Sequence, residues 1–277
     1  MKLALRQLLS VATLVVGFLL GQPAHAASPQ FANVSQGDFD NIVRELSANG
    51  MFHSVTPASS MGSILGLEVG VIAGVTRTPE IDRLVRNAGG SKMDKFPHAG
   101  LLGVISTPVG FTGEVVFIPK LAAEGVDYSS AGAAIKWVPT DKALPLFPLN
   151  VAIRAFYTQN TVSYSQTVTD TQTAAVSQSD VDFTGKIMGA QLLLSPKLIP
   201  ILEPYIGIGT IKADGRMSMT GSSTFFNFTT ARTAKSSATT TQLLAGLDIR
   251  LLLLGIGFEY SNAFKTETMT AKLSFKF

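Results

Sequence analysis

Side chains that could act as catalytic bases are few in this sequence. The 277-residue chain has three histidines and no cysteine. His25 lies in an apolar N-terminal segment, and His53 and His98 have no acidic or sulfur neighbours in the sequence. No G-x-S-x-G turn supplies a nucleophile, and no spacing typical of zinc ligands is present. The sequence predicts no catalytic centre and no cofactor; a metal site built from carboxylates alone stays open.

Charged side chains instead recur at alternate positions of apolar stretches. In "TQLLAGLDIRL" Asp248 and Arg250 share one parity, while the other parity is apolar from Leu243 to Leu251. Successive side chains of a β-strand point to opposite faces, so this spacing predicts a strand with one apolar and one partly charged face. "SILGLEVGVIAGVT" repeats the pattern around Glu68, and its glycines, at about 1 kcal/mol each, disfavour a helix.

Ten such stretches predict an all-β chain. They are residues 63–76, 98–106, 111–119, 130–138, 149–158, 181–194, 203–212, 239–251, 255–261 and 267–277. Alternation is poor in 98–106 and 181–194, which predicts a bulge or a misplaced boundary and leaves eight or twelve strands as alternatives. Long connections at 77–97, 159–180 and 213–238 alternate with shorter ones, as do the external loops and periplasmic turns of transmembrane barrels. We therefore expect an antiparallel up-and-down transmembrane β-barrel over residues 62–277.

The N-terminus indicates export. Lys2 and Arg6 precede the apolar run "LLSVATLVVGFLLG", and "PAHA" follows it, which predicts a signal peptide over residues 1–26. The run is shorter than the ~20 residues of a spanning helix. Removing Lys2 and Arg6 lowers the basic count from 22 to 20 against 19 acidic residues, so the mature net charge is near +1. No basic run indicates a nucleic-acid partner.

The C-terminal sequence "AKLSFKF" resembles the last strand of bacterial outer-membrane β-barrels. By that resemblance Leu273, Phe275 and Phe277 would be the signal read by the barrel-assembly machinery, and Phe277 would seal the last strand against the first. "VTPASS", "PLNVAIRAFY" and "LEPYIGIGT" are similar to an uncharacterised family of exported barrels with a short N-terminal helix. The resemblance implies the outer membrane of a Gram-negative cell, with outer-membrane lipid as the surroundings, and supplies no activity.

Residues 27–61 form an expected periplasmic segment with a helix over 38–49. Asp38 or Asp40 could cap it, Gly50 could end it, and Phe39, Ile42, Val43 and Leu46 form an apolar stripe. A plug, a cover or a helix on the inner leaflet are the alternatives. We expect a cover, because a ten-stranded barrel is only modestly wider than an eight-stranded one, which its own side chains fill.

The charged parity of the strands would line the lumen. Lys136, Arg154 and Lys186 predict a basic stripe with only Glu114 nearby, which in a narrow pore favours anions. The remaining inward charges are ion-pair candidates that would satisfy one another. The candidates are Glu68, Glu114, Asp248, Arg250, Glu259 and Lys272.

Three function classes follow from this sequence. The first is a monomeric narrow passive channel or small-solute transporter with a partly basic lumen. The second is a structural or adhesin-like barrel with a closed lumen, whose long loops, including "STFFNF" at 223–228, contact an external surface ligand. The third is a soluble exported β-sandwich or lipid-binding barrel, which would bury the apolar parity. An enzyme is not expected, with a barrel-borne hydrolase or lipid-modifying enzyme as the residual exception.

Overall fold

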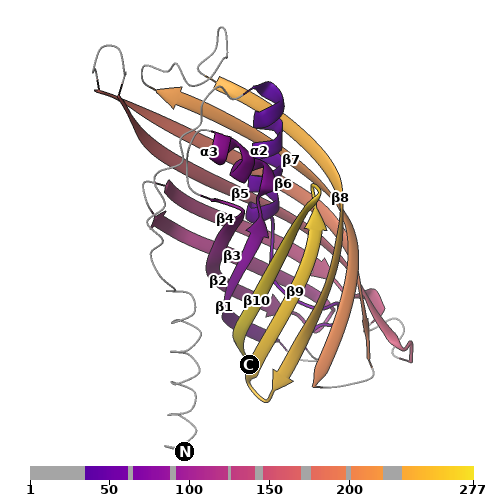
Figure 1. Ribbon diagram of the computed structural model, residues 1–277. Helices are drawn as coiled ribbons and strands as arrows, with labels where there is room; N and C mark the ends of the chain where they lie inside the picture. Colours follow the sequence, from indigo (N-terminus) through magenta and orange to yellow (C-terminus); the bar gives the residue numbers. More distant parts are fainter. Residues whose placement is uncertain are drawn as a thin grey trace, which may run out of the picture.

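Ten antiparallel strands form a closed barrel in the computed structural model of the chain (Figure 1). The structure describes residues 35–61, 65–87, 92–123, 126–140, 146–169, 176–197, 201–220 and 233–277. Strand order around the barrel follows the sequence, and β1 pairs with β10. The strands are β1 (Gly66–Arg77), β2 (Lys95–Ser106), β3 (Phe111–Ala123), β4 (Val126–Trp137), β5 (Leu149–Thr169), β6 (Val176–Pro196), β7 (Leu202–Thr220), β8 (Thr233–Leu251), β9 (Leu254–Ala263) and β10 (Thr266–Lys276).

The predicted barrel and its ten strands are confirmed, but several predicted boundaries are wrong. The supposed long loops 159–180 and 213–238 belong largely to β5, β6, β7 and β8, which run 19 to 21 residues each. Polar Ser/Thr-rich sequence there hid the strands, because their outer face is hydrophilic as well as part of the inner one. The register of β5 with β6 and of β6 with β7 is continuous as described, whereas a shift lies in β3 between Ile118 and Leu121. The "STFFNF" segment lies outside the described residues.

The two ends of the barrel differ. We call the end that carries Phe277 the C-terminal end and the opposite one the hairpin end. Phe277 closes the barrel through its backbone: its amide donates to Leu67 O at 2.7 Å, and Leu67 N donates to Phe277 O at 3.0 Å. At the hairpin end the β5–β6 and β7–β8 hairpins rise well above β9, β10 and β1, so the rim is steeply uneven (Figure 1).

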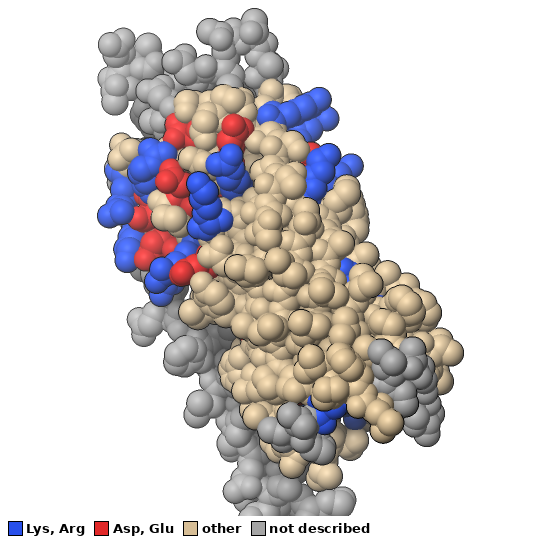
Figure 2. Space-filling model, turned by 90° about the vertical axis from the view of Figure 1, so that its right-hand side faces the viewer, with Lys and Arg blue, Asp and Glu red and all other residues tan. Residues whose placement is uncertain are grey.

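An apolar band encircles the outside of the barrel. Figure 2 shows charged side chains gathered at one end and a broad uncharged zone beside them. The zone is built from outward side chains that are 41% to 59% exposed, such as Val75, Ile206 and Met269. A contiguous apolar surface of this extent is unsuited to water and suits the hydrocarbon of a bilayer. The soluble alternative is therefore wrong, since it required this parity to be buried.

Two helices accompany the strands within the part of the chain that the structure describes. Helix α2 (Gln36–Gly50) begins with a capping box in which Ser35 and Asp38 bond reciprocally, and α3 (Pro79–Asn87) lies between β1 and β2 at the hairpin end. No described helix is both long and apolar enough to cross a membrane.

Helix α2 lies inside the barrel, so the expected periplasmic cover is wrong. It lies among the strands (Figure 1) and contacts β1, β2, β5, β6, β7, β8 and β10. Phe39 and Val43 are fully buried there. Glycines on both sides of the contact make the room: a Cβ on Gly215 of the wall would lie 2.7 Å from Val43, and one on Gly50, the last residue of α2, would meet Asn160 of β5. The helix therefore fits in the lumen where glycine allows close approach to the wall.

Candidate functional site

Residues 35–61, hereafter the plug, run through the lumen from the hairpin end to the C-terminal end. Its first residues lie beside the β7–β8 hairpin, where Gln36 donates to Lys235 O at 3.3 Å. Midway, Asn160 Nδ2 donates to Leu46 O at 3.3 Å. Near the C-terminal end, Met61 N donates to Ser106 Oγ at 3.4 Å. The N-terminal part of the plug is thus at the hairpin end, opposite to Phe277.

The last part of the plug rests on a group of charged wall residues, hereafter the charged floor. Five of them are acidic and five basic, and all lie in the lumen wall, mostly towards the C-terminal end. They are Glu68, Glu114, Glu203, Asp248, Glu259, Lys136, Arg154, Arg250, Lys272 and Lys276. The balance of signs means that the floor has no net basic character.

Glu114 is the anchor for the plug. Ser54 Oγ donates to Glu114 Oε2 at 2.6 Å, and Thr56 Oγ1 donates to Oε1 at 2.8 Å. Arg154 Nη1 lies 2.7 Å from Ser54 Oγ and 3.4 Å from Glu114 Oε2. Between the two hydroxyl residues, Val55 has φ of 51°, a left-handed conformation that a β-branched residue adopts only under constraint. The shared carboxylate supplies that constraint.

The predicted basic stripe of three residues is wrong. Lys136 and Arg154 are neighbours across β4 and β5 and are both buried, but Lys186 is exposed on the outer face of β6. Weak alternation in β6 concealed its parity: Ile187, the next residue, is the one that faces the lumen. Lys136 Nζ also lies 3.4 Å from Glu114, so the two remaining cations share one carboxylate. The physical basis for anion preference is therefore absent from the described wall.

Asp248 joins the cations on the other side of the floor. It lies 3.0 Å from Lys272 Nζ and 3.4 Å from Arg250 Nε, and Lys276 Nζ is hydrogen-bonded to it. Lys272 also lies 2.8 Å from Glu68 Oε1, across the closing β1–β10 seam. Arg250 continues to the plug, donating to Ser59 Oγ and to Glu203, each at 2.8 Å.

Glu259 is inward as predicted, but its hydrogen-bond partner is not one of the other ion-pair candidates. Tyr205 Oη donates to it at 2.9 Å, and His53 Nδ1 of the plug lies 4.0 Å away. His53 stacks on His98 with ring centroids 5.0 Å apart, and His98 Nδ1 lies 3.0 Å from Asn49 Oδ1. Sequence reasoning left both histidines isolated, because their neighbours come from β2, β9, β10 and the plug. No clear sequence signal could have paired them.

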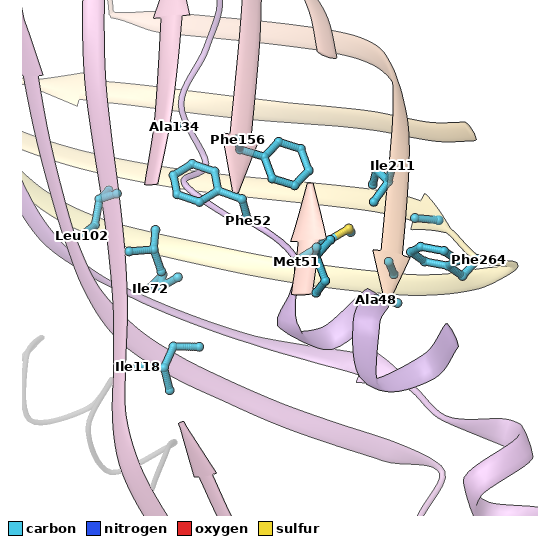
Figure 3. Close-up of a cluster of buried hydrophobic side chains, with 14 of the residues drawn as sticks. Ala48, Met51, Phe52, Ile72, Leu102, Ile118, Ala134, Phe156, Ile211 and Phe264 are labelled. Atoms are coloured by element: carbon cyan, nitrogen blue, oxygen red, sulfur yellow. The ribbon is translucent and has the colours of Figure 1, made fainter. Parts of the chain in front are cut away.

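An apolar layer fills the lumen between the floor and α2. Phe52 of the plug stacks on Phe156 of β5 at 5.9 Å, and Met51 lies near Ile211 and Phe264 (Figure 3). The wall contributes further aliphatic side chains from β1 to β4 and β6. They are Ile72, Leu102, Val104, Val116, Ile118, Ala134 and Ile187. The plug therefore meets polar groups at the floor and apolar groups above it.

A family match covers the whole barrel together with the plug. The model of a family of unknown function (DUF6588) matches residues 25–277. The chain belongs to this family. No curated relative matches the sequence.

Solved structures similar to the chain are bacterial surface or outer-membrane proteins. The attachment invasion locus protein Ail of Yersinia pestis is 11% identical, with a TM-score of 0.32 over 77% of this chain and 97% of its own. The outer membrane protease OmpT from Escherichia coli is 8% identical, with a TM-score of 0.42 over 81% and 100%. The translocator domain of autotransporter NalP from Neisseria meningitidis is 12% identical, with a TM-score of 0.44 over 87% and 95%. Identities this low assign no activity.

Helix α2 is also tied to α3 at the hairpin end. Both Glu45 carboxylate oxygens accept from the first turn of α3, from Glu80 N at 2.7 Å and Ile81 N at 2.9 Å. Burial nevertheless raises the pKa of Glu45 to about 7. Arg83 closes the same contact by donating to Asp38 Oδ1 at 2.6 Å.

Replacing Glu45 by Gln is expected to stabilise the protein at pH 8 and to have little effect at pH 4. The folded state binds the Glu45 proton more tightly than the unfolded chain, so its contribution to stability falls as pH rises from the usual carboxyl value towards 7. Gln is uncharged like the protonated carboxyl, and its amide oxygen can still accept one of the two backbone hydrogen bonds. Urea unfolding of both variants in lipid vesicles at the two pH values would check this. An equal difference at both would contradict it.

Proposed function

We propose that the protein is an outer-membrane conduit for small solutes, closed at rest by its own plug. The observation that carries the proposal is the plug itself: a separate segment, joined to the wall by hydroxyl, amide and carbonyl contacts, occupies the whole length of the lumen. An eight-stranded barrel fills its interior with its own side chains. In this protein the plug, which is not part of any barrel strand, fills the interior.

The energetics of the floor allow such movement. The side chains of Glu114 and Arg154 are 0% exposed because the plug covers them. Burying charges costs several kcal/mol per ion, and their mutual attraction only partly offsets that cost. If residues 54–59 moved away, water would hydrate the charged floor. Exposure of these charges therefore does not oppose movement of the plug. The left-handed Val55, at about 1–3 kcal/mol, adds strain that departure would release.

Orientation follows from the fold class. Outer-membrane barrels have both barrel termini at the periplasmic side, so the C-terminal end with Phe277 would be periplasmic and the hairpin end external. Leu273, Phe275 and Phe277 would then be the assembly signal on the outward face of the last strand. Helix α2 would begin at the external mouth.

A disulfide between plug and wall is expected to abolish opening. The chain lacks cysteine, and an ideal Cβ on Gly50 would lie 3.2 Å from Asn160 Cβ, near the ~3.8 Å of a disulfide. We expect the refolded Gly50→Cys/Asn160→Cys variant, once oxidised, to show no conductance steps in planar bilayers, and reduction to restore them.

The matched control joins two wall residues. An ideal Cβ on Gly132 would lie 3.3 Å from Thr158 Cβ on the adjacent strand, so Gly132→Cys/Thr158→Cys adds the same bond within the wall. The new Cβ would also lie 3.0 Å from Phe52 Cδ2 of the plug, but this contact is the same in the oxidised and reduced forms, so only the bond differs between them. The control should conduct when oxidised. Equal open probability in locked and unlocked plugs would contradict the proposal. So would an unlocked chain that never opens.

A surface-interaction barrel is the second candidate. Strands β5 to β8 are 19 to 21 residues long, about twice the 9–11 residues needed to cross a bilayer. The excess builds a wall beyond the membrane that could contact an external ligand. Silence of the unlocked barrel would favour this role.

A further inference from the structure

A cavity of about 80 Å³ lies at the hairpin end of the lumen. Plug helix α2, helix α3, the segment before β2, and strands β2 and β4 to β7 all contribute to it. Its lining residues are Ile42, Leu46, Ile81, Met93, Phe96, Val126, Val162, Tyr164, Val181, Phe183 and Met217. It is distinct from the charged floor and from the plug contacts with Glu114.

The lining residues favour apolar ligands over polar ones. No lining residue carries a charge, and ten of the eleven have purely apolar side chains or thioethers. A polar solute would lose its hydrogen bonds to water there without replacement, at a cost of several kcal/mol. Apolar cavities accept apolar guests. The favourable occupant is an uncharged, apolar molecule.

The volume of the cavity limits the size of the ligand. The volume is roughly half that of the ~150 Å³ apolar cavity known to hold benzene. Met93, before β2, and Met217, on β7, both line the space, and the unbranched thioether side chain adapts its shape readily. We therefore expect a short hydrocarbon or a single ring to fit when these side chains move.

The position of the cavity connects it to the conduit. Ile42 and Leu46 belong to the plug, so an occupant touches the gate directly. Phe96 and Val162 line the cavity and also pack against the apolar layer around Phe52. That layer would line the passage once the plug moved. The apolar surface is therefore continuous from the cavity to the middle of the lumen.

We propose that this cavity is the binding site of a small apolar molecule, and that such molecules are the solutes of the conduit. The second half of this statement rests on the proposed function. The site itself does not, since it requires only the lining and the volume.

Methionine methyl groups provide the test, with toluene as the probe. The full mature chain, labelled with ¹³C at its methionine methyls, is placed in deuterated lipid nanodiscs and titrated with toluene. Met93 and Met217 should show saturable chemical-shift changes. Met188 and Met269 face outward, 45% and 59% exposed, so they report partitioning into lipid and should change without saturation.

A variant that fills the cavity tests whether toluene binds at this site. Val162→Phe extends a lining side chain into the cavity and is expected to weaken toluene binding by about tenfold or more. Val75→Phe makes the same change on the outer face, where Val75 is 41% exposed, and should leave binding unchanged. Met93 and Met217 signals that never saturate, or that saturate equally in Val162→Phe, would overturn the site.

The two proposals fail separately. Saturable binding in a barrel whose opening does not depend on the plug would refute the conduit and leave the site standing. Plug-dependent opening without saturable toluene binding would refute the site and leave the conduit standing.

Discussion

A cysteine at position 37 is expected to react with a bulky maleimide added outside intact cells. Gly37 is exposed on the first turn of α2, and a Cβ there would meet only Ser35 Oγ at 3.8 Å. Because the chain has no other cysteine, the label reports one position. The plug runs from the hairpin end inward, so its beginning should be external while Phe277 is periplasmic. We expect nearly complete labelling of Gly37→Cys in intact cells with this orientation, and almost none with the reverse one.

The control tests the opposite end of the barrel. Val109, in the turn between β2 and β3, is 64% exposed. Val109→Cys should stay unlabelled in intact cells and react after the outer membrane is permeabilised, using a PEG-linked maleimide too large for porins. Protection of Gly37→Cys together with labelling of Val109→Cys would reverse the orientation. Protection of both in intact cells would refute an external plug terminus.

Replacing Asp248 by Asn is expected to destabilise the barrel by about 3–5 kcal/mol. Asp248 is fully buried and is the shared partner of Lys272, Lys276 and Arg250. Lys272 would keep Glu68 and Arg250 would keep Glu203, but Lys276 has no other carboxylate among its described ion pairs. Removing one partner of a buried ion network leaves a charge without compensation, which accounts for the size of the effect. Urea unfolding in lipid vesicles measures it.

An exposed ion pair supplies the comparison. Arg77 and Glu267 lie 2.9 Å apart, with side chains 68% and 37% exposed. Glu267→Gln should therefore cost between zero and about 1 kcal/mol. Equal losses for Asp248→Asn and Glu267→Gln would show that the floor is as hydrated as the surface, and that the plug does not seal it.

Local pattern in the sequence predicted the strands and their faces. Alternation of Leu67, Val69 and Val71 against Glu68 is a property of neighbouring residues, and the structure places those three outward and Glu68 inward. The same rule failed at Lys186, where polar residues on both faces of β6 left the parity undefined. The same rule predicted β5 to β8 too short, because strand segments that extend beyond a bilayer need no apolar outer face.

The helix shows the limit of local information. Its apolar stripe and Gly50 predicted residues 38–49, close to the observed Gln36–Gly50, but the N-cap is Ser35 and the predicted caps Asp38 and Asp40 are wrong. The same stripe would serve a cover, a plug or an interfacial helix. The deciding facts are inward glycines such as Gly215, whose lack of a side chain admits Val43. Only closure of the barrel brings those residues to the helix.

The candidate sites divide in the same way. The sequence by itself determined which residues are charged and on which parity of a strand they lie, because side-chain direction follows from backbone geometry. The tertiary structure alone decided that Glu114 holds Ser54 and Thr56, that His53 stacks on His98, and that an apolar cavity lies above them. Those contacts join residues from the plug and from strands distant in sequence. They depend on barrel width and strand register, and no local pattern encodes either.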